Sequence, residues 1–415
     1  MDQRARISRH VAAPPADLIT DQPPKPIEFH TACARATVGA MQPATMLTPR
    51  MFELRRLLMP LVRPFRTSFG TETVCEVMVV RVVTDVGQGW GESAIESEPL
   101  YLSEFHDAAD HVLTDHLIPR LFAAGPLRAE NVAAILAPVK GHRMAKSALE
   151  MALLDAQLRA DGTSFQRYIG GTRPSVPVGV SVGITDTIDE LIEVVADYVA
   201  EGYTRVKLKI EPGCDIEPVR RVREANPDLM LQVDANTAYT TADIEHLRAL
   251  DDFDLALIEQ PFGEDDLLGH AELARRISTP VCLDEAIRSV DHIRSALALR
   301  AAHIINIKPA RVGGYIAAIE AHDVCLAAGI PVWCGGMLET GIGRAANLAL
   351  ASLGGFTLPG DISATKRYWA RDITAPFDLV DGKIQVPTGL GFGVEVDTEY
   401  VEELTFERRE IFAER

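Results

Sequence analysis

Between residues 176 and 362 the chain repeats short apolar runs, which read VPVGVSVG (176–183), TRVKLKI (204–210), LMLQVDANT (229–237), LALIEQP (255–261), VCLDEA (281–286), HIINIKP (303–309), IPVWCGG (330–336) and FTLPGDI (356–362). Amphipathic stretches of about 12 to 15 residues separate them, as in helices that cover a sheet. Eight buried strands that alternate with helices predict an α/β fold built as a parallel barrel. A doubly wound sheet rarely keeps so regular a rhythm.

The sequence on either side of the barrel has a different pattern of apolar and polar residues. Residues 1–48 show neither helical nor strand periodicity, and we expect a disordered N-terminal extension there. Residues 49–170 begin with alternating, β-rich sequence and continue with helical stretches, which predicts an α+β domain. The barrel is assigned to residues 171–375, and the strand-like residues 376–415 are expected to pair back with the α+β domain.

The composition excludes several classes of protein. The 415 residues include 41 Lys and Arg against 59 Asp and Glu, a formal net charge of −18. This charge argues against nucleic acid or an anionic membrane surface as a partner. No run reaches the roughly 18 uninterrupted apolar residues of a membrane span, and we expect a cytoplasmic protein. Six cysteines without CxxC pairs are expected to be reduced thiols, and they are Cys33, Cys75, Cys214, Cys282, Cys325 and Cys334.

Ionisable residues stand at the C-terminal ends of five consecutive runs. They are Lys207 with Lys209, then Asp234, Glu259, Asp284 and Lys308. From Lys209 onward, each follows the previous one by 24 or 25 residues, which is one β/α unit. We therefore expect them to meet at the C-terminal mouth of the barrel, where barrel active sites lie. A charge embedded in an apolar strand is costly unless it is paired or bound to metal, so the five strands need a common explanation.

The acidic members of this set predict a metal site between two lysines. Asp234, Glu259 and Asp284 supply hard oxygen ligands suited to Mg²⁺. A substrate carboxylate bound to this metal would place its α-carbon between Lys209 and Lys308. Such a position suits proton abstraction, because the metal and an ammonium group stabilise the negative charge that develops. The sequence thus predicts a metal-dependent enzyme that acts on a small carboxylate.

Three further polar residues accompany the predicted ligands and bases. Lys207 lies two residues before Lys209 on the same strand face, and its like charge is expected to favour the neutral, basic form of Lys209. Asn236 and Glu285 follow Asp234 and Asp284 closely and can orient them. Both can equally be ordinary loop residues, so two interpretations stay open for them.

A structural interpretation competes at each single position. A lone acidic residue at a strand end is more often a helix cap, and a lone KxK motif is usually a solvated face. The joint pattern argues against this interpretation, because caps have no reason to recur beside lysines on both flanking strands.

The order KxK, Asp, Glu, Asp, Lys resembles the enolase superfamily, in its muconate-lactonising branch, from about residue 52 to 397. Longer stretches resemble the group of o-succinylbenzoate synthases and N-acylamino acid racemases. These stretches are PFRTSFGT (64–71), GHRMAKSALEMALLDA (141–156), VKLKIEPG (206–213), LQVDANTAY (231–239), LIEQP (257–261), NIKPARVGGY (306–315), IPVWCGGMLETGIGRAANLALASL (330–353) and FTLPGDIS (356–363).

The resemblance implies an α+β capping domain over a (β/α)7β barrel, with Mg²⁺ or Mn²⁺ held by the three carboxylates, and a homo-oligomer. In the synthase reaction of menaquinone biosynthesis, it implies that Lys209 takes the α-proton of a succinyl-hydroxycyclohexadiene carboxylate and assists departure of hydroxide. Lys308 stabilises the enediolate. In racemisation of N-succinyl or other N-acylamino acids, the two lysines act as opposed bases. Which of the two reactions is physiological stays open.

The resemblance also implies where substrate specificity lies. It points to the cap loop from Pro64 to Thr71 and to the last strand ends. The candidates for substrate contact that follow are Phe65, Phe69, Ser181, Arg311 and the backbone N–H groups of Gly336 and Met337. At least one of the two phenylalanines can instead pack in the cap core, and Ser181 can be a small packing residue. Arg311 matches a position that the racemase-capable branch also fills with arginine.

Two other classes of protein compete with this prediction. GIGRAA (341–346) suggests a dinucleotide-binding loop, but no acidic residue follows about 20 positions later at the end of a strand. We therefore interpret it as the start of a helix. A barrel that has lost catalysis is expected to lack at least one ligand or lysine, and none is missing.

Overall fold

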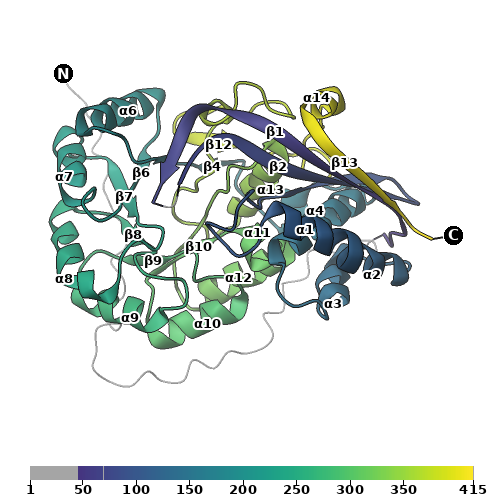
Figure 1. Ribbon diagram of the computed structural model, residues 1–415, viewed down its shortest axis with the longest axis horizontal. Coiled ribbons are helices and arrows are strands. Elements are labelled where there is room, and N and C mark those ends of the chain that lie inside the picture. The colour runs from purple at the N-terminus through teal and green to yellow at the C-terminus, as the bar shows by residue number, and fades with distance from the viewer. Residues whose placement is uncertain (1–44, 69, 415) are drawn as a thin grey trace. The chain divides into compact units, whose positions relative to one another are not determined.

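The structure is a computed structural model that describes residues 45–68 and 70–414 (Figure 1). Residues 1–44 and Phe69, and with them most of the predicted N-terminal extension and one predicted substrate contact, lie outside the described residues. Leu47 is fully buried and pairs with Leu127 through two backbone hydrogen bonds of 2.8 Å. Leu47, which lies inside the predicted extension, is therefore packed against the cap.

Four antiparallel strands form one sheet in the order β13-β1-β2-β3. Their bounds are β1 (Pro49–Thr67), β2 (Gly70–Thr84), β3 (Gln88–Ser93) and β13 (Thr405–Phe412). The last strand of the chain, yellow in Figure 1, pairs with the first along the register from Met51 opposite Phe412 to Leu57 opposite Thr405. The two ends of the described chain thus belong to the same sheet.

Helices cover this sheet, and two glycines set how closely the longest one packs. The helical elements are α1 (His106–Val112), η2 (Leu113–Leu117), α2 (Ile118–Ala123), η3 (Ala129–Asn131), α3 (Val132–Leu136), α4 (Arg143–Ala160) and α5 (Phe165–Ile169). A Cβ added at Gly89 would lie 2.3 Å from the backbone oxygen of Ala152, and one at Gly91 would lie 2.3 Å from that of Ala148. Strand β3 can therefore lie directly on α4 only because it carries glycine at both positions.

Seven parallel strands form the second sheet, in sequential order from β5 to β11. They are β5 (Val180–Val182), β6 (Arg205–Lys209), β7 (Met230–Asp234), β8 (Leu257–Glu259), β9 (Val281–Leu283), β10 (Ile304–Ile307) and β11 (Val332–Cys334). The helical elements between and after them are α6 (Ile188–Glu201), α7 (Ile216–Ala225), η4 (Thr241–Asp243), α8 (Ile244–Leu247), η5 (Arg248–Phe253), α9 (Leu267–Arg276), α10 (Val290–Leu299), α11 (Pro309–Val312), α12 (Tyr315–Ala327) and α13 (Gly341–Ala351). Figure 1 shows α6 to α10 and α12 as a partial ring outside the curled sheet. The predicted α/β class and TIM-like barrel are confirmed.

The eighth predicted run does not form a regular strand. FTLPGDI makes two isolated parallel bridges, Phe356 with Val332 of β11 and Gly360 with Val178 just before β5. Pro359 lies between them and has no backbone N–H to donate, so a continuous ladder cannot form there. The segment still joins the two edge strands, because Thr357 donates to Val332 at 3.2 Å and Gly179 donates to Gly360 at 2.8 Å.

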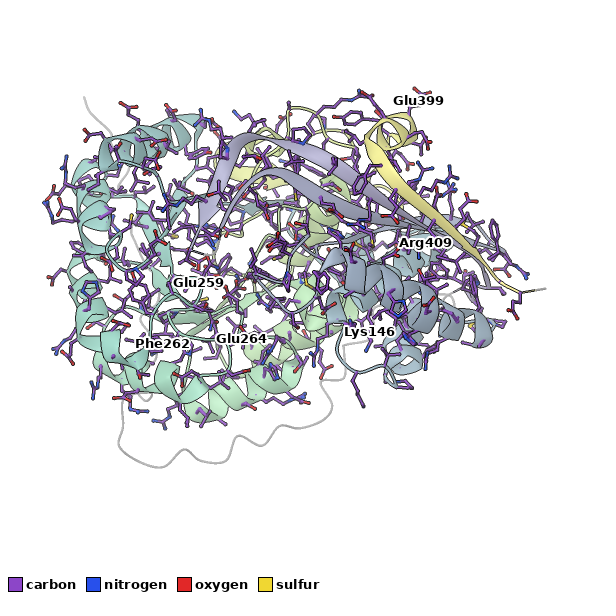
Figure 2. All side chains as sticks on the ribbon, viewed as in Figure 1. Lys146, Glu259, Phe262, Glu264, Glu399 and Arg409 are labelled. Atoms are coloured by element: carbon purple, nitrogen blue, oxygen red, sulfur yellow. The ribbon has the colours of Figure 1, made fainter. Side chains whose placement is uncertain are left out.

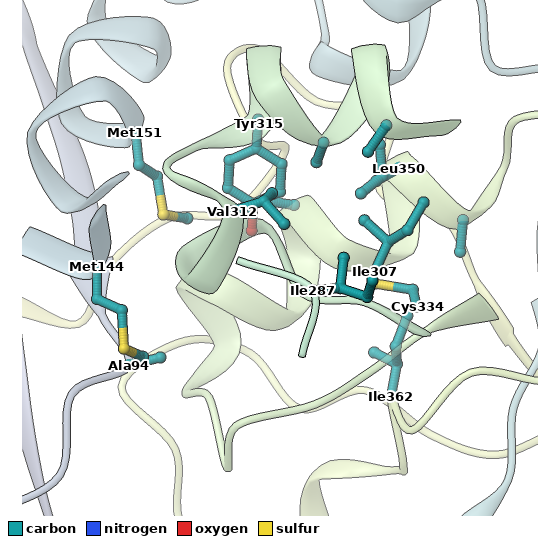
Figure 3. Close-up of a cluster of buried hydrophobic side chains, with 14 of the residues drawn as sticks. Ala94, Met144, Met151, Ile287, Ile307, Val312, Tyr315, Cys334, Leu350 and Ile362 are labelled. Atoms are coloured by element: carbon teal, nitrogen blue, oxygen red, sulfur yellow. The ribbon is translucent and has the colours of Figure 1, made fainter. Parts of the chain in front are cut away.

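The remaining elements connect the C-terminal segment to the rest of the fold. Strand β12 (Lys383–Gln385) pairs with β4 (Ser175–Pro177), and the other two elements are η6 (Thr365–Arg367) and α14 (Thr398–Leu404). One large cluster of buried apolar side chains spans both sheets. In Figure 3, Met144 and Met151 of α4 lie in the same cluster as Val312 and Tyr315 of the barrel. Each buried methionine contributes roughly 1.5–3 kcal/mol, so the cap and the barrel stabilise one another.

The cysteines of the described region are all free thiols, as predicted, and Cys33 lies outside it. No helix in the described part of the chain is long and apolar enough to cross a membrane.

Candidate active site

The strand register brings the predicted residues side by side at the end of the barrel. Lys209 on β6 lies opposite Asp234 on β7, which lies opposite Glu259 on β8. Asp284 directly follows β9, and Lys308 directly follows β10. Figure 2 labels Glu259, which projects from β8 inside the ring of helices. Parallel strands end at one edge of the sheet, so the regular spacing in the sequence becomes a cluster in space.

Lys207 forms ion pairs with three carboxylates. Its Nζ lies 2.9 Å from Asp234 Oδ2, 2.7 Å from Glu259 Oε2 and 2.7 Å from Asp361 Oδ2. Burial disfavours its charge, but the carboxylates of Asp234, Asp361 and Glu259 outweigh burial and raise its pKa well above the usual value. Lys207 is therefore a fixed cation, which suits a structural and electrostatic role better than a role as a base.

Lys209, the predicted base, is held by the last residue of β7 and by Asn236, two positions after that strand. Its Nζ lies 2.7 Å from Asp234 Oδ2 and 2.5 Å from Asn236 Oδ1. Asn236 in turn donates to Glu285 Oε1 at 2.8 Å, and its own N–H donates to Asp234 Oδ1 at 3.0 Å. Asn236 and Glu285 thus belong to the network that orients the lysine and the ligand, which favours the first of the two interpretations left open by the sequence.

Asp284, Lys308 and Arg311 form a second group with the phenol of Tyr101. Lys308 Nζ lies 2.9 Å from Asp284 Oδ2 and donates to the Tyr101 hydroxyl at 2.8 Å. Arg311 forms an ion pair with Asp284 and donates to the same hydroxyl at 2.7 Å. Burial opposes ionisation of Asp284, but Arg311 and Lys308 outweigh it and hold its pKa below the usual range.

Arg311 is 1 % exposed, and its other N–H groups donate to backbone oxygens of Ile287 at 2.8 Å and Asn306 at 3.2 Å. These bonds, together with those to Asp284 and Tyr101, hold the guanidinium in place. Its predicted substrate contact stays a prediction, and the observed contacts favour an indirect role.

The carboxyl groups influence one another strongly. Burial opposes the charge of Asp234, but Lys207 and Lys209 outweigh it and lower its pKa. At Glu259, burial and then repulsion from Asp234 raise the pKa to about 8, and Asp284 adds to that repulsion. The three carboxyl groups therefore lie close enough to repel one another, so a cation among them would favour the ionised form of each.

The donor set fits a hard divalent cation in its chemistry. In residues 45–68 and 70–414, no three acidic, histidine or cysteine side chains already surround one point at metal-ligand spacing. Lysine ammonium groups lie next to these carboxylates, and the ammonium of Lys207 lies between Asp234 and Glu259. Each carboxylate oxygen has two lone pairs, so these bonds leave acceptor capacity for a metal. Oxygen donors of this kind are the ligands that Mg²⁺ prefers.

Sequence reasoning missed three residues of the site. Asp361 forms ion pairs with Lys207 and Arg205, Asn306 donates to Glu259 Oε1 at 2.7 Å, and Tyr101 comes from the cap. Asp361 stands near the C-terminal end of the eighth apolar run, so its position was a usable signal. Tyr101 lies in a loop between β3 and α1, and nothing in its local sequence marks it.

Replacing Asp361 with alanine is expected to lower the free energy of unfolding by about 3–5 kcal/mol, because buried Arg205 loses its carboxylate partner. Urea-induced unfolding measures the change. Glu320→Ala is the matched control, since Glu320 is exposed and pairs with Arg294 at 3.1 Å. Exposed pairs contribute about 0–1 kcal/mol. Equal losses in the two variants would contradict the structural role of Asp361.

The predicted specificity residues are spread around the mouth of the barrel. Ser181 lies opposite Lys207 in the register, and its Oγ is buried without a hydrogen-bond partner among the residues that the structure covers. A buried hydroxyl of this kind normally has a partner, which favours a ligand contact. The N–H of Met337 already donates to Glu339 Oε2 at 2.8 Å. A substrate contact at Met337 therefore requires exchange of this bond.

The cap loop packs against the barrel rather than standing free. Phe65 makes an edge contact with Tyr368 at 6.3 Å between ring centroids, and the Arg367 guanidinium lies 5.5 Å from its ring. The packing role left open for Phe65 is thus the one that these contacts support. Ser68 Oγ donates to the backbone oxygen of Asn236 at 3.2 Å, which brings this loop to the edge of the site.

GIGRAA forms the first part of α13, as the helix interpretation predicted. Thr340 caps the helix, and the carboxylate of Glu92 accepts from the N–H of Gly343 at 2.9 Å. A carboxylate of the chain itself occupies the place that a phosphate takes in a dinucleotide site.

A TIM-like barrel with a separate α+β cap, and with acidic and lysine side chains at its C-terminal mouth, defines a class of barrel enzymes. The match to known families agrees with this class. Residues 52–170 match the mandelate racemase / muconate lactonizing enzyme N-terminal domain, and residues 190–401 match the enolase C-terminal domain-like family. The chain belongs to the enolase superfamily.

Relatives of known name cover most of the chain. An N-succinylamino acid racemase of Amycolatopsis sp is 60 % identical over 85 % of this chain and 96 % of the relative. An o-succinylbenzoate synthase of Geobacillus kaustophilus is 47 % identical over 85 % and 94 %. A solved structure of an enolase superfamily member from Listeria innocua matches with a TM-score of 0.85 at 38 % identity, over 89 % of this chain and all of that chain. Synthase and racemase names both occur among these relatives.

Proposed function

We propose that this enzyme is an o-succinylbenzoate synthase that also racemises N-succinylamino acids. The first reaction is the dehydration of 2-succinyl-6-hydroxy-2,4-cyclohexadiene-1-carboxylate in menaquinone biosynthesis. One observation carries the proposal: Lys209 and Lys308 pair with carboxylates on opposite sides of the acidic cluster, Asp234 and Asp284. Two amines placed on either side of one carboxylate-binding point can reach both faces of an α-carbon, and both reactions begin by removing the α-proton.

The proposed cofactor is Mg²⁺ or Mn²⁺, held by Asp234, Glu259 and Asp284. When bound, the metal neutralises the substrate carboxylate and stabilises the negative charge that develops on it. The chain supplies the rest of the electrostatic environment. Against the burial that opposes their charge, Lys207 favours the ionised forms of Asp234 and Glu259, and Arg311 favours that of Asp284.

In the dehydration, Lys209 removes the proton from the α-carbon, and the electron pair of that bond moves into the carboxylate as an enediolate. The ammonium of Lys308 lies on the far side, where it stabilises this charge. Lys209 then returns its proton to the departing hydroxide on the same face, so that water leaves and the ring becomes aromatic. Asn236 holds the amine in place during both transfers.

In the racemisation, the same intermediate is reprotonated from the opposite face. Lys209 removes the α-proton of one enantiomer, and Lys308 donates a proton to the other face. For the second enantiomer the roles are reversed. The 60 % identity to a chain named N-succinylamino acid racemase favours this as a second candidate for the physiological reaction.

A side-by-side assay tests the proposal. We expect measurable kcat/KM for the cyclohexadiene carboxylate and for N-succinylamino acids, loss of both activities in EDTA, and recovery with Mg²⁺. The ion should also raise the midpoint of thermal unfolding, because a ligand that binds only the folded state stabilises it. Activity on both substrates that survives removal of divalent metal would contradict the metal-dependent chemistry, and activity on neither would contradict the function.

A further inference from the structure

A buried carboxylate of the cap reaches into the barrel at a place where the proposed chemistry does not use it. Glu92 is the second-to-last residue of β3 and is 5 % exposed. Gly89 and Gly91, through their close approach to α4, fix the strand that carries it. The glycine spacing of this strand therefore sets the position of the carboxylate as well as the packing of the cap.

Glu92 accepts three hydrogen bonds from the first turn of α13. The N–H of Thr340 donates to Oε1 at 2.8 Å, and the Thr340 hydroxyl and the Gly343 N–H donate to Oε2 at 2.7 and 2.9 Å. A negative charge at a helix N-terminus is favourable, because the unpaired N–H groups and the helix dipole both point toward it. A residue larger than glycine at position 343 would crowd this contact, because its Cβ would lie 3.0 Å from Glu92 Oε2.

The segment 335–340 connects this contact to Lys308. At its first residue, a Cβ added at Gly335 would lie 2.8 Å from Lys308 Cε, so the lysine side chain runs directly across this glycine. At its other end, Thr340 is held by Glu92. Four residues thus lie between the contact with the proposed second base, at Gly335, and the contact with the cap, at Thr340.

One bond within the segment, and three that it accepts from α13 and Trp369, hold it in place. Glu339 accepts from the Met337 N–H at 2.8 Å and from Asn347 Nδ2 at 2.9 Å. The backbone oxygen of Glu339 accepts from Arg344 at 3.0 Å and from Trp369 at 3.3 Å. The position of the segment therefore depends on the N-terminal part of α13, which Glu92 holds at Thr340 and Gly343.

We propose that Glu92 is a positioning residue through which the cap fixes segment 335–340 and, with it, the side chain of Lys308. This inference rests on the proposed function. Proton transfer needs a donor placed within hydrogen-bond reach of the carbon, whereas stabilisation of charge by an ammonium depends weakly on small displacements. Racemisation, in which Lys308 transfers a proton, therefore depends on Glu92 more than dehydration does.

The test is Glu92→Gln in the full-length enzyme, with both reactions measured under identical conditions. Glutamine keeps the size of the side chain but replaces one acceptor oxygen with a donor that faces the N–H groups of α13. We expect kcat for racemisation to fall about tenfold to a hundredfold, since small misplacements of a reacting group have effects of this size. KM should stay within about threefold, and dehydration should change by less than about threefold.

Glu150→Gln is the matched control. Glu150 is also a buried carboxylate of the cap, and it accepts from the Ile316 N–H at 3.1 Å at the start of α12. General loosening of the cap should change the rates of both reactions by the same factor. This variant should therefore keep the ratio of the racemisation rate to the dehydration rate. Glu92→Asp, which keeps the charge on a shorter side chain, should recover part of the lost racemisation.

Three outcomes would overturn the positioning role. One is an equal change of both reactions in Glu92→Gln, and another is the same shift of their ratio in Glu150→Gln. The third is a loss confined to KM. Absence of both activities from the wild-type enzyme would instead contradict the proposed function, so the two failures can be told apart.

Discussion

Replacing Lys209 with alanine is expected to lower kcat for dehydration and for racemisation by about a thousandfold or more. A positioned general base contributes typically 10²–10⁴-fold, and Lys209 serves dehydration twice, once as base and once as acid. Its Nζ lies 2.7 Å from Asp234 and 2.5 Å from Asn236, and alanine cannot replace either contact. Steady-state assays on both substrates measure the effect.

Lys366→Ala is the matched control for this variant. Lys366 is an exposed lysine that pairs with Glu201 at 3.0 Å, away from the acidic cluster. It should keep kcat within about a factor of two, because exposed ion pairs contribute little. Appreciable turnover by Lys209→Ala, with a circular dichroism spectrum like that of the wild type, would show that another group removes the α-proton.

The second large effect is expected for Lys308→Ala. This variant should lose racemisation but still exchange the α-proton of one enantiomer with solvent. The variant loses the ammonium that pairs with Asp284 at 2.9 Å and contacts Tyr101 at 2.8 Å. Racemisation should fall below detection, because one face of the intermediate has no proton donor. Dehydration should fall about 10²–10³-fold, since one stabilising charge is lost.

Deuterium exchange in D₂O makes this prediction sharper. Lys209 remains in the variant, so it should still exchange the α-proton of one enantiomer with solvent while that enantiomer keeps its configuration. The other enantiomer should show no exchange. Racemisation retained by Lys308→Ala would rule out the scheme of two opposed bases, even if Lys209→Ala behaves as expected.

The sequence predicted most of the reacting groups because their spacing has a physical cause. Asp234, Glu259 and Asp284 recur at one β/α unit, and parallel strands end at one edge of the sheet. A periodic pattern in the chain therefore becomes proximity in space. Lys207 was expected to help favour the neutral form of Lys209, and the structure places its ammonium against the carboxylates of Asp234, Glu259 and Asp361.

Contacts between residues far apart in the chain could not be predicted in this way. Tyr101 reaches Asp284 across 183 positions, and Glu92 reaches Thr340 across 248. No period connects such pairs, because they belong to different domains whose packing depends on the whole fold. The predicted oligomeric state and domain boundaries likewise stay predictions.

The amino-acid sequence by itself therefore determined the barrel. It also determined which strand ends carry acidic residues or lysines and in what order these strands occur. The reason is that backbone hydrogen bonding turns regular spacing in the sequence into regular geometry. Only the tertiary structure decided which partner each charge meets. Buried charges are stable where the surrounding fold supplies opposite charge and hydrogen bonds, and those partners come from any part of the chain that packing brings near. The segment around Pro359 illustrates the difference between the two. Its apolar sequence predicted a strand, but the proline has no backbone N–H, and the segment forms only two isolated bridges.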